Sequence, residues 1–251
     1  MTVKQAANVL DLIEFFAEHR RAATLAEIAR HFDWPKSSAF KLLGTLVERG
    51  YLYEPRAKGG YYPAPLLAEM AGRIEAAQPI PAELHALLEA LVRKTGETAV
   101  LAAASGAQAL FLDAVESPNA IRYTAQRGKT VPLHVTATGR ALLSQMSAED
   151  RASVLRKARF DRHTEGTLMD AAAVETEIER SMARGWFLGN AEFTPGLGGV
   201  AVALKLPGRH LAVLVAGPMF RVQQQTDSLA EWLLVACREC ETRLAERGEA
   251  G

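Results

Sequence analysis

Within residues 1–62, three stretches with helical apolar spacing are separated by short breaks and followed by two aromatic runs around a turn. The first stretch has an apolar face at 3, 4 and 7 spacing, formed by Ala6, Val9, Leu10, Ile13, Phe16 and Ala17. The second opens with Thr24 and Glu27, whose spacing predicts a capping box and therefore a helix start. This pattern predicts the order of the helices and of the hairpin in residues 1–62.

The third stretch begins after the break "DWP" and predicts a helix that starts at Pro35 and ends near Gly50. Its apolar stripe is formed by Ala39, Leu42, Leu43, Leu46 and Val47. The segment "YLYEPRAKGGYYP" then has β-prone aromatic residues on both sides of "PRAKGG", which predicts a hairpin with a basic tip. Three helices followed by a basic hairpin predict a winged helix-turn-helix domain over residues 1–62.

The apolar stripe of the third helix leaves a polar and basic face on its other side. Hydroxyls and free amides in a first helical turn donate to phosphate oxygens, and lysines add charge-paired contacts or reach base edges. The sequence therefore predicts binding to double-stranded DNA, with protein contacts through the winged helix as the alternative. The predicted DNA-binding residues are Thr24, Lys36, Ser37, Ser38, Phe40, Lys41, Arg56 and Lys58.

The rest of the chain predicts a linker helix and a larger second domain. Residues 63–78 have helical apolar spacing up to the break "QPIP", and residues 79–251 form the remainder. In that remainder, helices are predicted over 82–96, 138–158, 170–184 and 223–247, and strands over 98–104, 109–116, 120–125, 199–206 and 210–217. Strands joined mostly by tight turns, with helices grouped between them, predict an α+β domain with an antiparallel sheet.

Bulk properties exclude several classes of protein. The 251 residues are 49% apolar with a formal net charge of zero, so a sizeable core is expected and no whole-chain charge favours a membrane surface. No signal-peptide pattern and no uncharged apolar segment of spanning length occurs, which predicts a cytoplasmic protein without a membrane partner.

No motif predicts catalysis, a metal or a cofactor. Cys237 and Cys240 lie within a long helical pattern with no second ligand pair, and the histidines show no metal-ligand spacing. The glycines of "PGLGGVAVAL" are followed by a β-prone run, whereas a phosphate loop is followed by a helix. His134 is interpreted as a satisfied structural group, while Glu192 either faces a ligand or braces the glycine-rich loop.

Several segments together resemble the IclR family of bacterial transcription regulators. In the first part these are "LAEIARHFDWPKSSAFKLLGTLVERGYL" and "YYPAPLLAEMA". In the second part they are "GKTVPLHVTATGRALLSQM", "ARGWFLGNAEFTPGLGGVAVAL" and "LAVLVAGPMFR". The resemblance implies a winged helix-turn-helix domain, a linker helix and a GAF-like domain that binds a small-molecule effector. It also implies a homodimer or tetramer on a palindromic operator, acting as a repressor or an activator.

The resemblance also implies where an effector would bind. Family members that bind small organic acids carry an Asp, a Cys and two Ser in the pocket, and these positions fall on Gly189, Gly199, Leu214 and Ala216. The other pocket positions fall on Tyr123, Val131, Ala137, Thr138 and Leu197. Because few of these side chains form hydrogen bonds, we expect a wide, largely apolar pocket and an apolar or aromatic effector. A carboxylate on such a ligand would meet main-chain amides near residues 137–139.

Overall fold

The structure is a computed structural model that describes residues 3–56, 59–77 and 80–248. The chain divides into two compact units, Met1–Pro79 and Ile80–Gly251, and each is described by itself. Within the described ranges, no helix combines the length and the apolar character needed to cross a membrane.

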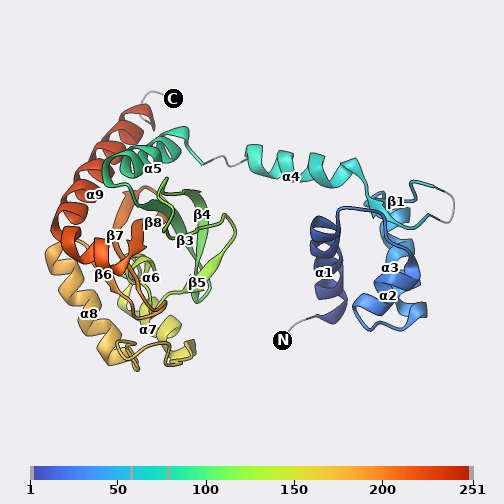
Figure 1. Cartoon of the computed structure of the whole chain (residues 1–251), viewed down its shortest axis with the longest axis horizontal. Helices are drawn as coiled ribbons and strands as arrows, with labels where there is room; N and C mark the ends of the chain where they lie inside the picture. Colours follow the sequence, from blue (N-terminus) through green and yellow to red (C-terminus); the bar gives the residue numbers. More distant parts are fainter. Residues whose placement is uncertain (1–2, 57–58, 78–79, 249–251) are drawn as a thin grey trace. The chain divides into compact units, whose positions relative to one another are not determined.

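The first unit contains the predicted three helices and hairpin (Figure 1). Its elements are α1 (Lys4–His19), α2 (Leu25–His31), α3 (Lys36–Glu48), β1 (Leu52–Tyr53), β2 (Tyr62–Pro63) and α4 (Pro65–Ala77). The strands β1 and β2 pair antiparallel, with Leu52 opposite Pro63. A core built from α1, α2, α3 and the hairpin includes Phe16, Ile28 and Leu43, so the predicted winged helix-turn-helix fold is confirmed.

The buried face of α1 differs from the predicted stripe. Leu12, Phe15 and Phe16 are buried, whereas Leu10 is 60% exposed and Ile13 is 37% exposed. Apolar residues cover more than one face of this helix, so spacing alone does not choose between them. The two aromatic rings contribute the larger apolar area, and their face is the one that packs in the core.

The second unit is built on a six-stranded antiparallel sheet with the order β5-β4-β3-β8-β7-β6. The strands are β3 (Thr98–Ser105), β4 (Gln108–Val115), β5 (Thr130–Pro132), β6 (Phe187–Asn190), β7 (Leu197–Leu206) and β8 (Arg209–Pro218). The helices are α5 (Ala82–Thr95), α6 (Ala137–Leu143), α7 (Ala148–Lys157), α8 (Ala171–Arg184) and α9 (Met219–Gly248).

Helices cover both faces of this sheet (Figure 1). On β8, Val213 and Val215 pack in the core with α5 and α9, while Leu214 and Ala216 pack in the core with α6, α7 and α8. A strand with both faces buried is apolar without a break, which explains the continuous run "LAVLVA". The predicted α+β class with an antiparallel sheet is therefore confirmed.

Two predicted elements of this unit are wrong in detail, and two strands were missed. Residues 120–125 form no strand, because side chains elsewhere hold their carbonyls: Thr98 Oγ1 donates to the Tyr123 carbonyl at 2.6 Å. The predicted helix over 138–158 is two helices, since Ser147 caps the start of α7 by accepting a hydrogen bond from the Asp150 amide. The short strands β5 and β6 have too few residues to show a clear alternation and were not predicted.

The two cysteines lie in the core between α9 and the sheet. Both Cys237 and Cys240 are buried free thiols, and burial raises the pKa of each. A protonated, buried thiol is a poor metal ligand and a poor nucleophile, so both residues act as core side chains.

Candidate functional site

The first candidate surface is the face of α3 opposite the core. Lys36, Ser37, Ser38, Phe40 and Lys41 are all exposed, while Ala39, Leu43 and Leu46 of the same helix are buried. Phe40 lies on the same face and is 59% exposed. One helix face therefore gathers two cations, two hydroxyls and an aromatic ring.

The starts of α2 and α3 are built differently. The Thr24 hydroxyl accepts a hydrogen bond from the Glu27 amide, and the Thr24 amide donates to the Glu27 carboxylate at 2.8 Å, which completes the predicted capping box. The Thr24 hydroxyl also donates to the same carboxylate. Hydrogen bonds from Thr24 and Arg21 lower the pKa of Glu27 to about 2. The Thr24 hydroxyl is thus already occupied as a cap. By contrast, no side chain caps α3, and its first-turn amides lie at the positive end of the helix dipole.

The hairpin is fastened to the turn that precedes α2. The backbones of Ala23 and Tyr61 exchange two hydrogen bonds of 2.8 and 3.0 Å. Gly60 has a φ of 94° and lies so close to Ala23 that a Cβ would come within 2.6 Å of its backbone, so glycine is required there. This attachment positions the hairpin, in whose turn Arg56 is exposed. The other predicted cation of the turn, Lys58, lies outside the described residues.

The second candidate site is a cavity in the second unit. All nine predicted effector positions line it, together with Lys129 and Glu192. The predicted positions are Tyr123, Val131, Ala137, Thr138, Gly189, Leu197, Gly199, Leu214 and Ala216. They come from β5, β6, β7, β8, the start of α6 and the segment before β5, so the sheet and α6 form the cavity walls.

The cavity is apolar but narrow, with a volume of about 70 Å³. Gly189 and Gly199 face each other across β6 and β7, as predicted for a wall without side chains. However, the Cδ1 atom of Leu214 lies 2.9 Å from the position that a Cβ at Gly199 would occupy. The expectation of a wide pocket is therefore wrong for this structure, because Leu214 fills the space that Gly199 leaves.

A larger open groove of about 760 Å³ lies beside the β7–β8 turn. Lys205, Arg209 and Glu241 contribute to its lining, and none of the nine predicted effector positions does. Its size alone does not make it the ligand site, because it contains none of the positions at which the family resemblance implies effector contacts.

The polar groups of the cavity lie mainly at Tyr123 and Lys129. Burial raises the pKa of the Tyr123 phenol, which stays neutral and able to donate a hydrogen bond. The Lys129 ammonium nitrogen lies 5.2 Å from the centroid of the Tyr123 ring, within the range of a cation–π contact. Lys129 was not predicted from the sequence, although it directly follows Gly128 in the quoted segment "GKTVP".

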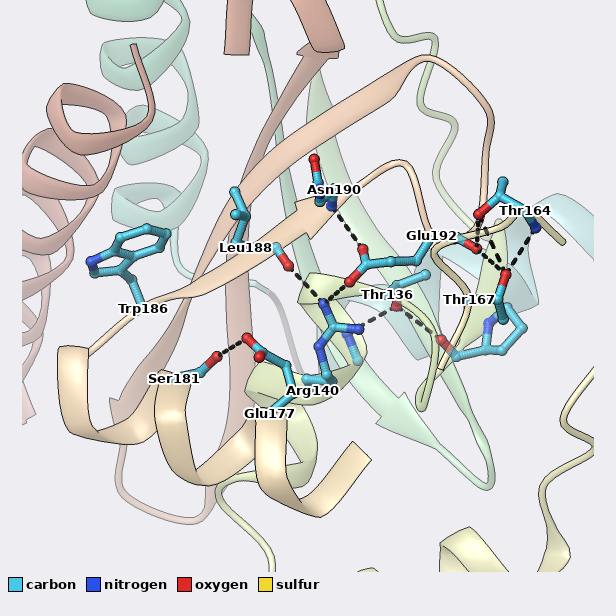
Figure 2. Close-up of polar contacts among 12 residues, drawn as sticks. Thr136, Arg140, Thr164, Thr167, Glu177, Ser181, Trp186, Leu188, Asn190 and Glu192 are labelled. Carbon is cyan, nitrogen blue, oxygen red and sulfur yellow. Dashed lines mark hydrogen bonds and ion pairs between the residues drawn. The ribbon is translucent and has the colours of Figure 1, made fainter. Parts of the chain in front are cut away.

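Glu192 braces the loop between β6 and β7, as one of its two predicted roles requires, and it also lines the cavity. Its carboxylate accepts hydrogen bonds from Arg140 Nη2 at 2.8 Å and from the Asn190 amide at 2.7 Å (Figure 2). Its carbonyl accepts a hydrogen bond from Thr167 Oγ1 at 2.8 Å. Arg140 also donates to the Leu188 carbonyl at 2.6 Å, which ties α6 to β6.

His134 does not line the cavity, and the expectation that it is a satisfied structural group is wrong. Its Nε2 atom is buried with no hydrogen-bond partner among the described residues. The ring packs edge-on against Phe160. Burial, together with the nearby His163 and Arg140, lowers the pKa of His134 and keeps the imidazole neutral.

A charged cluster fixes α5 to the edge of the sheet. Asp113 on β4 is buried, and its carboxylate accepts hydrogen bonds from His85 Nδ1 at 2.7 Å and from Arg127 Nε at 2.8 Å. Burial alone would raise the pKa of Asp113, but the hydrogen bonds from His85 and Arg127 outweigh it, so the pKa lies below its usual value. The ion pair with Asp113 holds Arg127 in place, and Arg127 precedes Lys129 by two residues in the sequence.

These two sites agree with what the chain is similar to. Residues 5–56 match the IclR helix-turn-helix domain, and residues 75–242 match the domain described as bacterial transcriptional regulator IclR C-terminal. The chain belongs to the IclR family. It is a transcriptional regulator with a helix-turn-helix domain and an effector-binding domain, and regulators of this family bind operator DNA and small-molecule effectors.

Named relatives of this IclR regulator cover almost its whole length. The HTH-type transcriptional regulator BhcR of Paracoccus denitrificans is 31% identical, over 98% of this chain and 88% of that protein. The acetate operon repressor of Salmonella typhimurium is 26% identical, over 94% of this chain and 88% of that protein. These homologues are transcriptional regulators rather than enzymes.

Among solved structures, an IclR homologue from Microbacterium hydrocarbonoxydans in complex with 4-hydroxybenzoate is 25% identical, with a TM-score of 0.77 over 96% of this chain and 99% of that one. The IclR protein of Thermotoga maritima has a TM-score of 0.72 at 22% identity, over 95% of this chain and 99% of that one. The latter likeness concerns the fold alone.

Proposed function

We propose that this regulator binds a palindromic operator as a homodimer or tetramer and responds to a largely apolar or aromatic small molecule. The observation that carries the proposal is the cavity lined by all nine effector positions of the family resemblance. Residues 1–62 bind DNA, residues 63–78 act as the linker helix, and residues 79–251 bind the effector. The protein uses no cofactor and catalyses no reaction.

The DNA contacts are assigned to α3 and the hairpin. Lys36, Lys41 and Arg56 neutralise phosphates, and Ser37 and Ser38 donate from the uncapped first turn of α3. Phe40 contacts base edges from the same exposed face. A second protomer is required because one short helix buries too little surface for specific binding.

The effector class follows from the lining. Ala137, Gly189, Gly199 and Ala216 contribute no side-chain hydrogen-bonding group to the lining, so a compact keto acid would lose its hydration with few polar partners in return. The cavity of about 70 Å³ must widen to admit an aromatic ring, which then gains by burial there and can stack on Tyr123. The 4-hydroxybenzoate complex of the Microbacterium homologue supports an aromatic acid as the effector class.

The effector acts by shifting an equilibrium between DNA-binding and non-binding states. It can do so only to the extent that it binds one state more tightly than the other. For allosteric proteins this coupling is typically about 1–3 kcal/mol. The fold is compatible with an effector that raises DNA affinity and with one that lowers it, so the same mechanism serves repression or activation.

DNA binding is tested by fluorescence anisotropy with the region upstream of the protein's own gene, at several salt concentrations. Each of the variants Lys36→Ala, Lys41→Ala and Arg56→Ala should reduce the slope of log affinity against log salt by about one unit. Lys157→Ala, at an exposed lysine of α7, is the matched control and should leave the slope unchanged. Salt-independent binding, or no binding, would instead favour protein contacts through the winged helix.

A further inference from the structure

The cavity contains one positive charge that the protein does not balance. Its two ionisable charged residues are Lys129 and Glu192. Glu192 is neutralised by Arg140, whose Nη2 atom lies 2.8 Å from its Oε1 atom. For Lys129, no carboxylate of residues 3–56, 59–77 or 80–248 lies within 4.0 Å of the ammonium group.

Nearby cations are all engaged elsewhere. Arg127 pairs with Asp113, and Arg122 pairs with Glu116. Arg221 binds Glu97 through two hydrogen bonds. The ammonium of Lys129 is therefore the charge that an anionic ligand of the cavity would meet.

The backbone of Lys129 is fixed at the rim of the cavity. Its carbonyl accepts a hydrogen bond from the Phe111 amide at 2.9 Å, and the Gly128 amide donates to the Phe111 carbonyl at 2.8 Å. Phe111 lines the cavity, so these bonds anchor Lys129 to the wall itself. Lys129 is exposed to solvent while its ammonium group lies over the Tyr123 ring, so the cation stands at the boundary between water and the apolar interior.

The start of α6 contributes no charged side chain to the lining of the cavity. The Thr136 hydroxyl donates to the Pro132 carbonyl at 2.8 Å and accepts from the Gly139 amide at 3.1 Å, so both groups are already bonded. This removes the Gly139 amide from the main-chain groups expected to hold a carboxylate. The other hydroxyls of the lining, from Tyr123, Thr138 and Thr194, carry no charge.

We propose that Lys129 binds the carboxylate of an aromatic monoanion at the rim of the cavity, with the ring directed inward past Tyr123. This inference rests on the proposed effector function and specifies its ligand as an anion held at the outer end. A carboxylate placed there keeps part of its hydration and gains a charge-assisted hydrogen bond, while the ring is buried among small residues.

The orientation predicts how binding depends on the charge of the ligand. Benzoate and benzamide have nearly the same shape, but only benzoate carries a carboxylate. The full-length protein is titrated calorimetrically with both, alongside Lys129→Met, Lys129→Arg and the control Lys157→Met. Wild type, Lys129→Arg and Lys157→Met should bind benzoate about tenfold or more tightly than benzamide, and Lys129→Met should lose that preference.

Each other result overturns the inference in a distinguishable way. If Lys129→Met keeps the wild-type affinity for benzoate, the carboxylate is bound elsewhere and the effector function stands. If wild type binds benzamide as tightly as benzoate, the site does not select an anion. If wild type binds neither compound, both the aromatic effector class and the role of Lys129 are rejected.

Discussion

Arg140 is fully buried, and its guanidinium is neutralised by a single carboxylate, that of Glu192. Its Nε and Nη1 atoms have no hydrogen-bond partner among the described residues, so the pair is only partly satisfied. A buried ion pair adds little net stability by itself, because desolvation offsets most of the attraction. Removing one member, however, leaves an uncompensated charge in the core.

We therefore expect Glu192→Ala to lower the free energy of unfolding by about 3 kcal/mol or more. The matched control is Glu175→Ala, which breaks the more exposed pair between Glu175 and Arg151 and should cost no more than about 1 kcal/mol. Urea unfolding followed by circular dichroism measures both. Equal losses for the two variants would contradict the role assigned to the Arg140–Glu192 pair.

Asp113 makes the stability of the second unit depend on acid pH. Its pKa is lower in the folded protein than in the unfolded chain, so the unfolded chain takes up a proton first as the pH falls. The stability that Asp113 contributes is present above its unfolded pKa of about 4 and is lost as the pH falls below it. Urea unfolding between pH 6 and pH 3 should show this loss.

The variant Asp113→Asn cannot titrate and serves as the comparison. It should be less stable than wild type at pH 6, because His85 and Arg127 lose their charged partner. The difference in the free energy of unfolding between wild type and Asp113→Asn should shrink as the pH falls from 6 to 3. A constant difference from pH 6 to pH 3 would show that Asp113 does not contribute through its charge.

At the scale of elements, α6 depends on a glycine at its start. A Cβ on Gly139 would lie 2.1 Å from the Leu133 carbonyl oxygen, and backbone cannot move aside as a side chain can. This close approach lets α6 lie against the segment after β5 and brings Ala137 and Thr138 to the cavity. The small residues of the sequence "TATGRALL" therefore serve packing as well as the lining of the cavity.

Gly139→Ala should destabilise the second unit by about 3 kcal/mol or more, because the added methyl group overlaps backbone atoms. Gly72→Ala in α4 is the control: no described atom lies within 4 Å of the added Cβ, and alanine should stabilise that helix by about 0.5–1 kcal/mol. Thermal unfolding of both variants separates the effects. A Gly139→Ala protein as stable as wild type would exclude the close packing of α6.

The elements that were predictable are those whose pattern depends on local spacing. The capping box at Thr24 and the buried stripe of Ala39, Leu43 and Leu46 can be recognised because their residues lie within a few turns. The face of α1 was not predictable, since its packing depends on which of several apolar residues meets distant helices. The strand predicted over residues 120–125 was wrong for the same reason: Thr98 and Arg221, which lie far away in the sequence, donate hydrogen bonds to carbonyls of this segment.

The candidate site was predictable in position but not in its charges. The positions implied by the resemblance, Gly189 and Gly199 among them, lie around one cavity, because strand register carries such positions over. That they bind an effector stays a prediction. Lys129 and Arg140 were missed, since one resembles any exposed lysine and the other any helical arginine. The burial of Arg140 and the neighbours of Lys129 are set by contacts between distant segments, which residue spacing does not encode.

At the scale of the whole molecule, the linkage between the two sites is reciprocal. An effector that changes the affinity for operator DNA must have a different affinity for the DNA-bound protein than for the free protein. The factor by which DNA changes effector affinity must equal the factor by which the effector changes DNA affinity. Couplings of about 1–3 kcal/mol correspond to changes in affinity of about 5–150-fold. Benzoate affinity should therefore change by the same factor on saturation with operator DNA as DNA affinity changes on saturation with benzoate.

Calorimetry with and without DNA measures the first factor, and fluorescence anisotropy measures the second. The double variant Lys36→Ala with Lys41→Ala, which should bind DNA weakly, is the control and should bind benzoate equally with and without DNA at the concentrations used. Benzoate binding by wild type that is indifferent to operator DNA would disprove coupling between the two activities.

The packing of Leu214 into the space beside Gly199 has an evolutionary consequence. A side chain at position 199 would require the Leu214 side chain to move, since the leucine methyl lies 2.9 Å from where the new Cβ would be. Among related regulators, the sizes of these two residues should therefore vary inversely, with a larger residue at one position accompanied by a smaller one at the other. A lineage can then exchange one effector for another through two paired substitutions on neighbouring strands while the sheet itself stays intact.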